Sequence, residues 1–358
     1  MSDTSALESL GWGEPFASAL APYAERGFVP ARVGVEHRSQ YLVLTGEHEL
    51  EAKLSGKLRL HMEQTGDRPV VGDWVVIKAQ GTGNSTIHAR LPRRSQISRK
   101  TAGRTSEEQV MAANIDTVFL ASSVNDDLNP RRLERYLLLA WESGARPVIV
   151  ITKADQTDKP METATSVESV AVGVPVHVIS SRTGFGVDEL QPYLLPGQTV
   201  AVLGSSGVGK STLINRLLGV ERMRTAEVRD DGRGRHTTTS RQLVRLPGGA
   251  LIIDTPGLRE LQLWEADTGL QEAFADIEQL SGECRFTDCK HESEPGCAVR
   301  AAVQSGALPA ERLDSFLRLR KELAFIEEKH DARAKAERDR LGRIGAKQLR
   351  KRLEEKND

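Results

Sequence analysis

The pattern of hydrophobic and polar positions changes three times along the 358 residues of the chain. Residues 31–102 contain short apolar runs separated by turns, which is typical of a small β-barrel. In residues 103–265, apolar runs alternate with helical patterns, which predicts an α/β domain around a parallel sheet. Residues 266–358 begin with a polar, cysteine-bearing stretch and continue with a helical pattern. After a leader over residues 1–30, we therefore expect three domains.

The first of these domains is predicted to contain about five strands, which favours a barrel of the oligonucleotide-binding (OB) type. Nucleic-acid binding would suit residues 90–104, which carry five arginines and one lysine but no acidic residue. The alternative is a solvated linker, which is the commoner meaning of a charge run. Tyr41 and Trp74 are as readily core residues as stacking platforms for bases. The strands that the pattern predicts are Tyr41–Leu44, Leu50–Leu54, Lys57–Leu60 and Val70–Ile77.

The second domain contains apolar runs that are typical of the buried strands of a parallel sheet. A helix between the first two is well marked, because Asn129 can cap its first turn and Pro130 takes the first helical position. A further helix is expected over Ser211–Leu218. The predicted strands are Val118–Ala121, Pro147–Ile151, Val174–Ile179, Thr199–Leu203 and Ala250–Asp254.

Composition adds little to this picture. The 49 Lys and Arg nearly balance the 50 Asp and Glu, so the net charge of −1 neither favours nor excludes a nucleic-acid partner. No stretch approaches the roughly 20 apolar residues of a membrane span, and the polar start Met-Ser-Asp-Thr-Ser is not a signal peptide. We therefore expect a cytoplasmic protein without a membrane partner.

The segment that follows the fourth strand reads GSSGVGKS and fits the phosphate-loop pattern G-x-x-x-x-G-K-[ST]. Its glycines allow a tight turn in which backbone N–H groups face phosphate oxygens. Lys210 would reach the β and γ phosphates, and the Ser211 hydroxyl would bind Mg²⁺. A chance Gly/Ser turn is the alternative, but the strand before it and the helix after it favour a nucleotide site. The expected contacts are Gly204, Ser205, Ser206, Gly207, Val208, Gly209, Lys210, Ser211 and Thr212.

The base of the nucleotide is predicted from Thr152-Lys153-Ala154-Asp155, which resembles the N-K-x-D motif of GTPases. In that motif the aspartate accepts from the N1 and N2 hydrogens of guanine, and the lysine stem covers the base. Adenine would leave these polar groups unpaired, so GTP and GDP are the expected ligands. Thr152 replaces the usual asparagine, and its hydroxyl reaches less far. Ser180 and Ser181 resemble the S-A motif, whose backbone meets the guanine O6.

The switch regions are expected in two places. Asp254-Thr-Pro-Gly257 matches D-x-x-G, in which the aspartate holds Mg²⁺ through water and the glycine N–H contacts the γ-phosphate. Residues 229–239 are polar and rich in arginine and glycine, and among Thr237, Thr238 and Thr239 we favour Thr238 as the threonine that senses Mg²⁺ and γ-phosphate.

The catalytic residue is less evident. Leu258 stands where Ras-like enzymes have the glutamine that orients the attacking water, which predicts slow intrinsic hydrolysis that a partner stimulates. His236 is our candidate for orienting water, and the alternative is that it contacts RNA or solvent.

All three cysteines lie in Cys284-x4-Cys289-x-His291-x5-Cys297, a cluster more typical of a metal site than of a disulfide framework. Three thiolates and one imidazole suffice for a closed, structural Zn²⁺ site, the alternative being chance clustering. An amphipathic helix over Leu308–Lys329 and a basic tail follow.

The motif for the base precedes the phosphate loop, the reverse of the usual order, so the domain looks circularly permuted. An OB-type barrel, a permuted GTPase domain and a Cys3His module followed by helices together resemble the ribosome small-subunit-dependent GTPase A family. The resemblance covers nearly the whole chain beyond the leader. It implies a monomer that binds the small ribosomal subunit and its rRNA late in assembly and hydrolyses GTP.

Two other functions compete with this one. Many phosphate-loop proteins are small-molecule kinases, although Asp155 and the D-x-x-G motif argue for GTP. The protein could also be an RNA-binding scaffold that nucleotide merely locks, with little need for hydrolysis.

Overall fold

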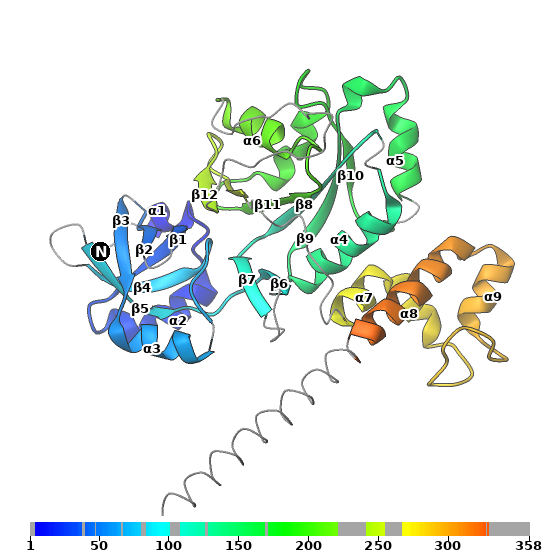
Figure 1. Ribbon diagram of the computed structural model, residues 1–358, viewed down its shortest axis with the longest axis horizontal. Coiled ribbons are helices and arrows are strands. Elements are labelled where there is room, and N and C mark those ends of the chain that lie inside the picture. Colours follow the sequence, from blue (N-terminus) through cyan, green and yellow to red (C-terminus); the bar gives the residue numbers. More distant parts are fainter. Residues whose placement is uncertain are drawn as a thin grey trace, which may run out of the picture. The chain divides into compact units, whose positions relative to one another are not determined.

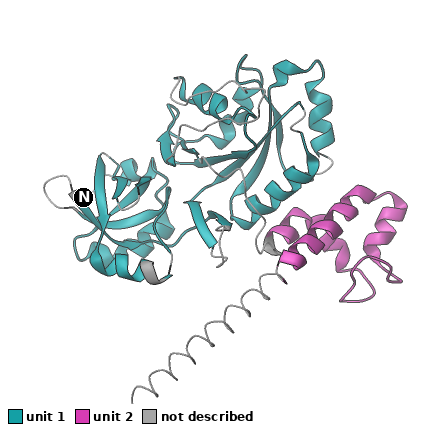
Figure 2. Ribbon diagram, in the orientation of Figure 1, with its two compact units in different colours: residues 1–101, 107–262 teal, residues 102–106, 263–358 magenta. Residues whose placement is uncertain are grey.

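A computed structural model describes residues 4–37, 40–46, 48–65, 67–79, 84–100, 108–125, 128–168, 171–220, 241–254, 267–326 and 328. These residues form two compact units (Figure 2). The first unit holds the described residues from 4 to 254, and the second holds those from 267 to 328.

The first unit begins with two helices, α1 (Thr4–Glu8) and α2 (Glu14–Ala24), in the region that was expected only as a leader. They cover an aromatic cluster on the outside of the barrel. The ring centroids of Trp12 and Trp74 lie 4.6 Å apart, and those of Phe16 and Trp74 lie 5.8 Å apart. Phe16 and Trp74 are fully buried, so Trp74 is a core residue rather than a stacking platform.

Five strands follow as a closed barrel, in the order β1-β2-β3-β5-β4 with β4 pairing back to β1 (Figure 1). Small and β-branched side chains fill its interior, among them Val33, Val43 and Ile77. Tyr41 is also buried there. The single helix between β3 and β4 and the parallel β3–β5 pair complete the OB-type barrel. The strands are β1 (Val29–His37), β2 (Gln40–Leu44), β3 (Glu49–Leu54), β4 (Trp74–Ala79) and β5 (Asn84–Arg90).

One predicted strand is wrong. Lys57–Leu60 lies inside helix α3 (Gly56–Thr65). The Ser55 hydroxyl accepts from the Leu58 N–H at 3.3 Å and so caps the first turn. Alternation over four residues is too short to distinguish a strand from a helix, and the segment is rich in good helix formers.

The basic run at residues 90–104 is largely neutralised where the structure describes it. Arg93 pairs with the buried Asp73 at 2.8 Å, Arg94 pairs with Asp116 at 3.3 Å, and Arg90 pairs with Asp67. Strands β6 (Gln96–Lys100) and β7 (Glu108–Ala113) then form a separate hairpin. These arginines support the barrel and its connection, so they are not a free patch for nucleic acid.

The α/β part of the first unit is a sheet of order β10-β9-β8-β11-β13-β12, parallel except for β12. Helix α4 packs on one face beside Leu120 and Ile149, and helix α6 packs on the other beside Phe119 and Val202. The strands are β8 (Thr117–Ser123), β9 (Arg146–Thr152), β10 (Val176–Val178), β11 (Thr199–Gly204), β12 (Gln242–Arg245) and β13 (Leu251–Asp254). The helices are α4 (Pro130–Glu142), η1 (Ala154–Gln156), α5 (Pro160–Glu168), η2 (Val187–Tyr193) and α6 (Lys210–Leu218).

The second unit is helical. Its elements are α7 (Asp267–Ala273), α8 (Ala275–Ser281), α9 (Ala298–Ser305) and a helix over residues 310–326, which lies within the predicted amphipathic helix. The rings of Phe274 and Phe316 pack 5.4 Å apart. Beside them, Arg312 pairs with Asp276 at 2.9 Å and covers the Phe274 ring.

Candidate nucleotide and metal sites

The described parts of the predicted nucleotide motifs lie at one edge of the sheet. Strands β10, β9, β8, β11 and β13 are parallel neighbours, so the connections after them leave from the same side. Residues 180–181 follow β10, residues 152–155 end β9, residues 204–211 end β11, and Asp254 ends β13. Motifs that are far apart along the permuted chain therefore lie next to one another at this edge of the sheet.

The phosphate loop has the tight geometry that its glycines predict. A Cβ on Gly204, where φ is +151°, would lie 2.3 Å from the Ala121 carbonyl oxygen. Gly209 precedes helix α6 with φ +98°, and Val208 is buried between them. The Lys210 ammonium group folds back and donates to the carbonyls of Gly204 at 2.8 Å and Ser205 at 2.5 Å. The loop is thus closed around its own lysine and leaves its exposed side to a ligand.

The base motif is tied to the phosphate loop by Thr152. Its hydroxyl hydrogen-bonds the Val208 carbonyl of the loop and lies 3.1 Å from the Ser122 carbonyl. Thr152 is only 2% exposed, so this contact is shielded from water. The threonine hydroxyl, although shorter than an asparagine amide, therefore spans the distance between the two motifs.

The polar edge of the base site is preorganised. Lys153 has φ +60°, a left-handed conformation that is strained for a residue other than glycine and that is found at binding sites. The Ser180 hydroxyl donates to one Asp155 carboxylate oxygen at 2.5 Å, and the exposed Arg182 guanidinium lies 2.8 Å from the other. The Ser180 hydrogen bond chiefly lowers the pKa of Asp155. The Ser181 hydroxyl is buried and has no hydrogen-bond partner among the described residues.

The metal and switch end of the site is described only in part. Asp254 is half-buried at the end of β13. Its pKa is raised, because the effect of burial is larger than the opposing effect of the positive charge on Lys210. Ser211 is half-buried in the first turn of α6, next to the exposed Thr212. His236, Thr238, Gly257 and Leu258 lie outside the described residues.

The sequence interpretation missed Arg132 and Arg182, because neither belongs to a motif. Arg182 directly follows Ser180 and Ser181. Arg132 lies in the first turn of α4, the helix that follows β8. Strand β8 lies between β9, which ends in the base motif, and β11, which ends in the phosphate loop. The strand order was the missing information.

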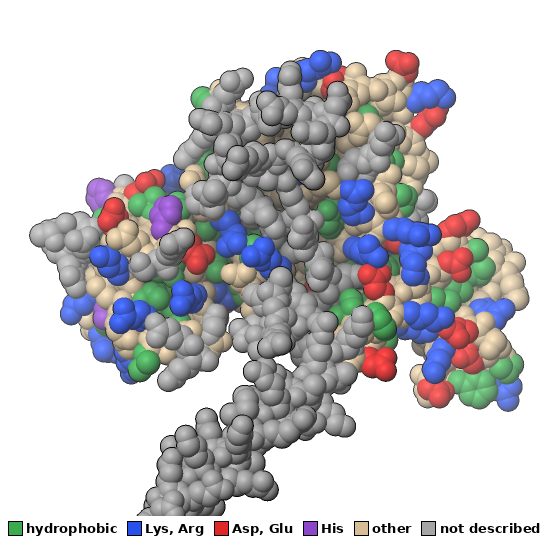
Figure 3. Space-filling view, viewed as in Figure 1, with side chains coloured by type: hydrophobic (Ala, Val, Ile, Leu, Met, Phe, Trp, Pro, Cys, Tyr) green, Lys and Arg blue, Asp and Glu red, His purple; other side chains and the backbone are tan. Residues whose placement is uncertain are grey.

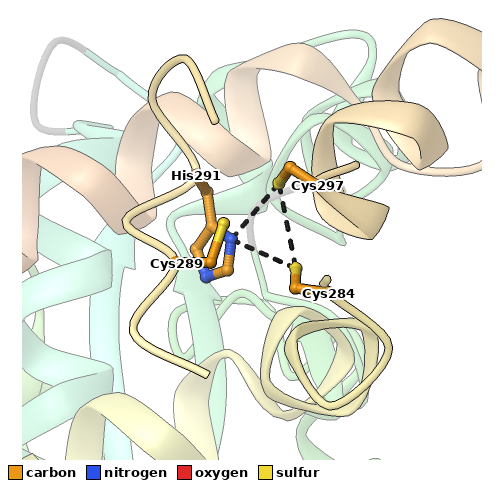
Figure 4. Close-up of side chains that lie close together, drawn as sticks. All are labelled: Cys284, Cys289, His291 and Cys297. Atoms are coloured by element: carbon orange, nitrogen blue, oxygen red, sulfur yellow. Dashed lines mark hydrogen bonds between the residues drawn. The ribbon is translucent and has the colours of Figure 1, made fainter. Parts of the chain in front are cut away.

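In the second unit, Cys284, Cys289, His291 and Cys297 converge, with their ligand atoms within 4.8 Å of one another (Figure 4). The Cys297 sulfur lies 3.9 Å from the Cys284 sulfur and 3.4 Å from His291 Nδ1. A tetrahedral ion about 2.3 Å from each sulfur places two sulfurs close to this separation. The cluster is therefore suited to a metal ion.

The imidazole of His291 is held in one orientation. The Ser281 hydroxyl donates to the Ile277 carbonyl at 2.8 Å and lies 3.0 Å from His291 Nε2. Since its one proton is used, the hydroxyl accepts from Nε2–H, which leaves the Nδ1 lone pair facing the three sulfurs.

Glu294 braces the loop that carries His291. Its carboxylate accepts 3.0 Å hydrogen bonds from the backbone N–H groups of Lys290, Glu292 and Ser293. Backbone hydrogen bonds of this kind lower the pKa of Glu294 to about 2.

Together, the fold and the first site define a circularly permuted P-loop GTPase between an OB-type barrel and a helical Cys3His module. Residues 90–264 match the model of the RsgA GTPase family. The chain is 45% identical over 350 residues to the small ribosomal subunit biogenesis GTPase RsgA of Opitutus terrae, covering 94% of this chain and 95% of that one. It is 46% identical over 344 residues to the protein of the same name from Streptomyces coelicolor, covering 94% of this chain and 92% of that one. The chain therefore belongs to the RsgA GTPase family.

Solved structures agree with this assignment. The crystal structure of YjeQ from Thermotoga maritima matches with a TM-score of 0.64 at 28% identity, covering 83% of this chain and 99% of that one. The structure of YloQ, described as a circularly permuted GTPase, matches with a TM-score of 0.61 at 23% identity, covering 84% and 96%, and supports the fold.

Proposed function

We propose that this protein binds the small ribosomal subunit late in its maturation and hydrolyses GTP there. Membership of the RsgA GTPase family supports the GTPase activity, and the names of the relatives, which refer to small ribosomal subunit biogenesis, support the choice of subunit. The observation that carries the chemical part is the hydrogen bond from Thr152 to Val208. It joins a guanine-type motif to a phosphate loop across two parts of the chain that are far apart in sequence.

Base selection rests on Asp155. Its lowered pKa keeps the carboxylate ionised at neutral pH, so both oxygens can accept from N1–H and N2–H of guanine. Ser180 holds the carboxylate while Arg182 gives way to the base. Lys153 covers one face of the ring, and residues 180–181 offer backbone N–H groups to its O6.

The phosphates are bound by residues 204–212, with Lys210 turning from the loop carbonyls to the β and γ phosphates. Ser211 and Asp254 would hold Mg²⁺, Ser211 through its hydroxyl oxygen and Asp254 through water. When bound, Mg²⁺ neutralises charge on the β and γ phosphates. Thr238 and Gly257 sense the γ-phosphate, and His236 orients the attacking water.

Leucine at position 258 cannot orient water, so intrinsic turnover is slow and the bound subunit accelerates it by ordering the switch segments. This design couples hydrolysis to a completed docking event. Idle consumption of GTP is thereby limited.

The ion of the second unit is Zn²⁺, held by three thiolates and one imidazole as a structural site without an open position. We place the limits of the barrel, GTPase and zinc-binding domains at residues 31–102, 103–265 and 266–358, and the protein acts as a cytoplasmic monomer. Among the described residues, no helix is long and apolar enough to cross a membrane.

The surface that meets rRNA includes the barrel. Lys and Arg side chains are spread over its exterior in the space-filling view (Figure 3). Exposed members include Lys53, Lys57, Arg59, Arg68 and Lys78, which can approach phosphates without first breaking the ion pairs of the connecting segment.

The test is GTP hydrolysis by zinc-loaded protein alone, with small subunits and with large subunits, using ATP as the control nucleotide. We expect slow GTP turnover that rises at least about tenfold with small subunits only, and little ATP turnover. Turnover that neither subunit changes would overturn the ribosomal part. An assembly function retained by Lys210→Ala would favour the alternative, a nucleotide-locked RNA-binding scaffold.

A further inference from the structure

Helix α4 brings a side chain that belongs to no motif to the phosphate loop. Strand β8 lies between β9, which ends in the base motif, and β11, which ends in the phosphate loop. The chain that leaves β8 leads into helix α4, and the guanidinium of Arg132 in this helix donates a hydrogen bond to the hydroxyl of Ser205. Ser205 is the second residue of the phosphate loop.

The position of Arg132 is fixed by its helix. The Asn129 side chain accepts from the Arg132 N–H at 3.2 Å and caps the first turn, which Pro130 begins. Leu133, which follows Arg132, and Leu137, one turn further along the helix, are buried in the hydrophobic core. A guanidinium on a capped and packed helix is a rigid support for a glycine-rich loop, whose backbone is intrinsically permissive.

Two positively charged side chains contact Ser205. Arg132 contacts its hydroxyl, and the Lys210 ammonium group contacts its carbonyl at 2.5 Å. Both charges are close to the place where phosphates bind, and they repel each other across one residue. The loop is therefore held at Ser205 by two positively charged side chains.

We propose that Arg132 is a positioning residue of the nucleotide site, which holds the phosphate loop through Ser205 in the conformation that binds GTP and GDP. This inference rests on the proposed GTP site. Because the contact is made to the loop and not to the reacting phosphoryl group, it contributes to ground-state binding of both nucleotides. It makes no contribution specific to the transition state.

The test measures the Kd of fluorescent GDP and of a fluorescent non-hydrolysable GTP analogue, together with kcat and KM for GTP. Arg132→Ala should raise both Kd values and KM about tenfold, the loss of one charge-assisted hydrogen bond, with kcat within about twofold. Arg132→Lys, which keeps the charge and a donor, should recover most of the affinity. Arg131→Ala is the matched control, because it removes the same charge from an exposed neighbouring position.

A double-mutant cycle with Ser205→Ala separates this role from general stabilisation. If Arg132 acts through Ser205, the double variant binds about as weakly as either single variant, rather than about a hundredfold more weakly than the wild type. Affinity of Arg132→Ala equal to that of Arg131→Ala, or a loss confined to kcat, would overturn the proposal. If Arg132→Ala fails to fold, Ser205→Ala decides, because it removes the same contact: normal Kd values in that variant overturn the proposal. Wild-type protein that binds neither nucleotide would instead contradict the proposed function.

Discussion

The nucleotide site and the metal site are built in opposite ways. The first gathers residues between Thr152 and Asp254 at the edge of a parallel sheet whose strands are buried on both faces. The second takes all four ligands from residues 284–297, on a loop and at two helix ends. One site therefore depends on the whole fold around it. The other would depend on a bound ion to hold a short segment together.

The two sites also differ in how far their protein groups satisfy one another. In the nucleotide site, Thr152 bonds Val208 and Ser180 bonds Asp155, so protein groups already satisfy one another. In the metal site, sulfur atoms face one another at 3.9 Å and must become thiolates to bind an ion. Without a cation those charges would repel. The metal site should therefore be more sensitive to the loss of one ligand.

The largest effect is expected for Cys297→Ser. Structural Zn²⁺ supplies roughly 10–16 kcal/mol in small metal modules, so loss of one thiolate should empty the site and unfold the second unit. The first unit should keep its affinity for GDP. Zinc content by mass spectrometry, circular dichroism and GDP titration measure the three results, with the exposed Lys290→Ala as control. Stoichiometric zinc in Cys297→Ser would contradict the assignment of the ligands.

Asp155→Asn should produce the next largest effect. The amide presents a donor to the guanine N–H groups, so affinity for GTP should fall about a hundredfold or more while zinc content stays unchanged. Titration calorimetry with GTP and ATP measures it, and the exposed Asp158→Asn is the control. If Asp155→Asn binds GTP normally, Asp155 does not select the base.

The same residue gives a pH prediction. The pKa of Asp155 in the folded protein is lower than the ordinary value of an aspartate, so the carboxylate stays charged until the pH falls through that lower value. GTP affinity should therefore be flat from pH 8 to about pH 5 as far as Asp155 is concerned. Affinity that falls in this window in the wild type but not in Asp155→Asn would contradict it.

A smaller effect is expected for Ser281→Ala. Removing the group that orients His291 should weaken zinc binding about 10- to 100-fold without emptying the site at saturating zinc. Competition with a chromophoric chelator measures the affinity. Ser293→Ala, in the loop near the same ligand, should leave it unchanged.

The smallest effect is expected for Thr152→Ala, which leaves the Val208 carbonyl without this donor and should weaken GTP binding about tenfold. Thr152→Ser keeps the hydroxyl and should stay within about threefold of the wild type. Equal affinity in all three proteins would show that the bond between the two motifs does not matter for binding.

Much of this organisation was predictable from sequence because the informative segments are dominated by one strong local constraint. Buried strands such as Pro147–Ile151 are continuous apolar runs, and the phosphate loop requires glycine where a Cβ would strike Ala121. The Cys3His spacing is likewise local. The predicted OB-type barrel, permuted GTPase fold and helical Cys3His module were confirmed.

What could not be predicted depends on tertiary contacts. Lys57–Leu60 alternates like a strand, yet the cap from Ser55 and the packing of Met62 favour a helix. The positive run at residues 90–104 does not reveal that Asp67, Asp73 and Asp116 neutralise much of it. Arg132 reaches the nucleotide site only because β8 lies between two strands that end in motifs. The order of strands in a sheet cannot be predicted from any single segment of the sequence.

The most direct test of the central claim is the affinity of the protein for isolated small ribosomal subunits in three states: with a non-hydrolysable GTP analogue, with GDP and without nucleotide. If switch segments at the nucleotide site control docking, the analogue-bound protein should bind at least about tenfold more tightly than the GDP-bound protein. Arg131→Ala should behave like the wild type, and Asp155→Asn should lose the difference. Equal affinities of the wild-type protein in all three states would contradict the account and favour a scaffold that nucleotide does not switch.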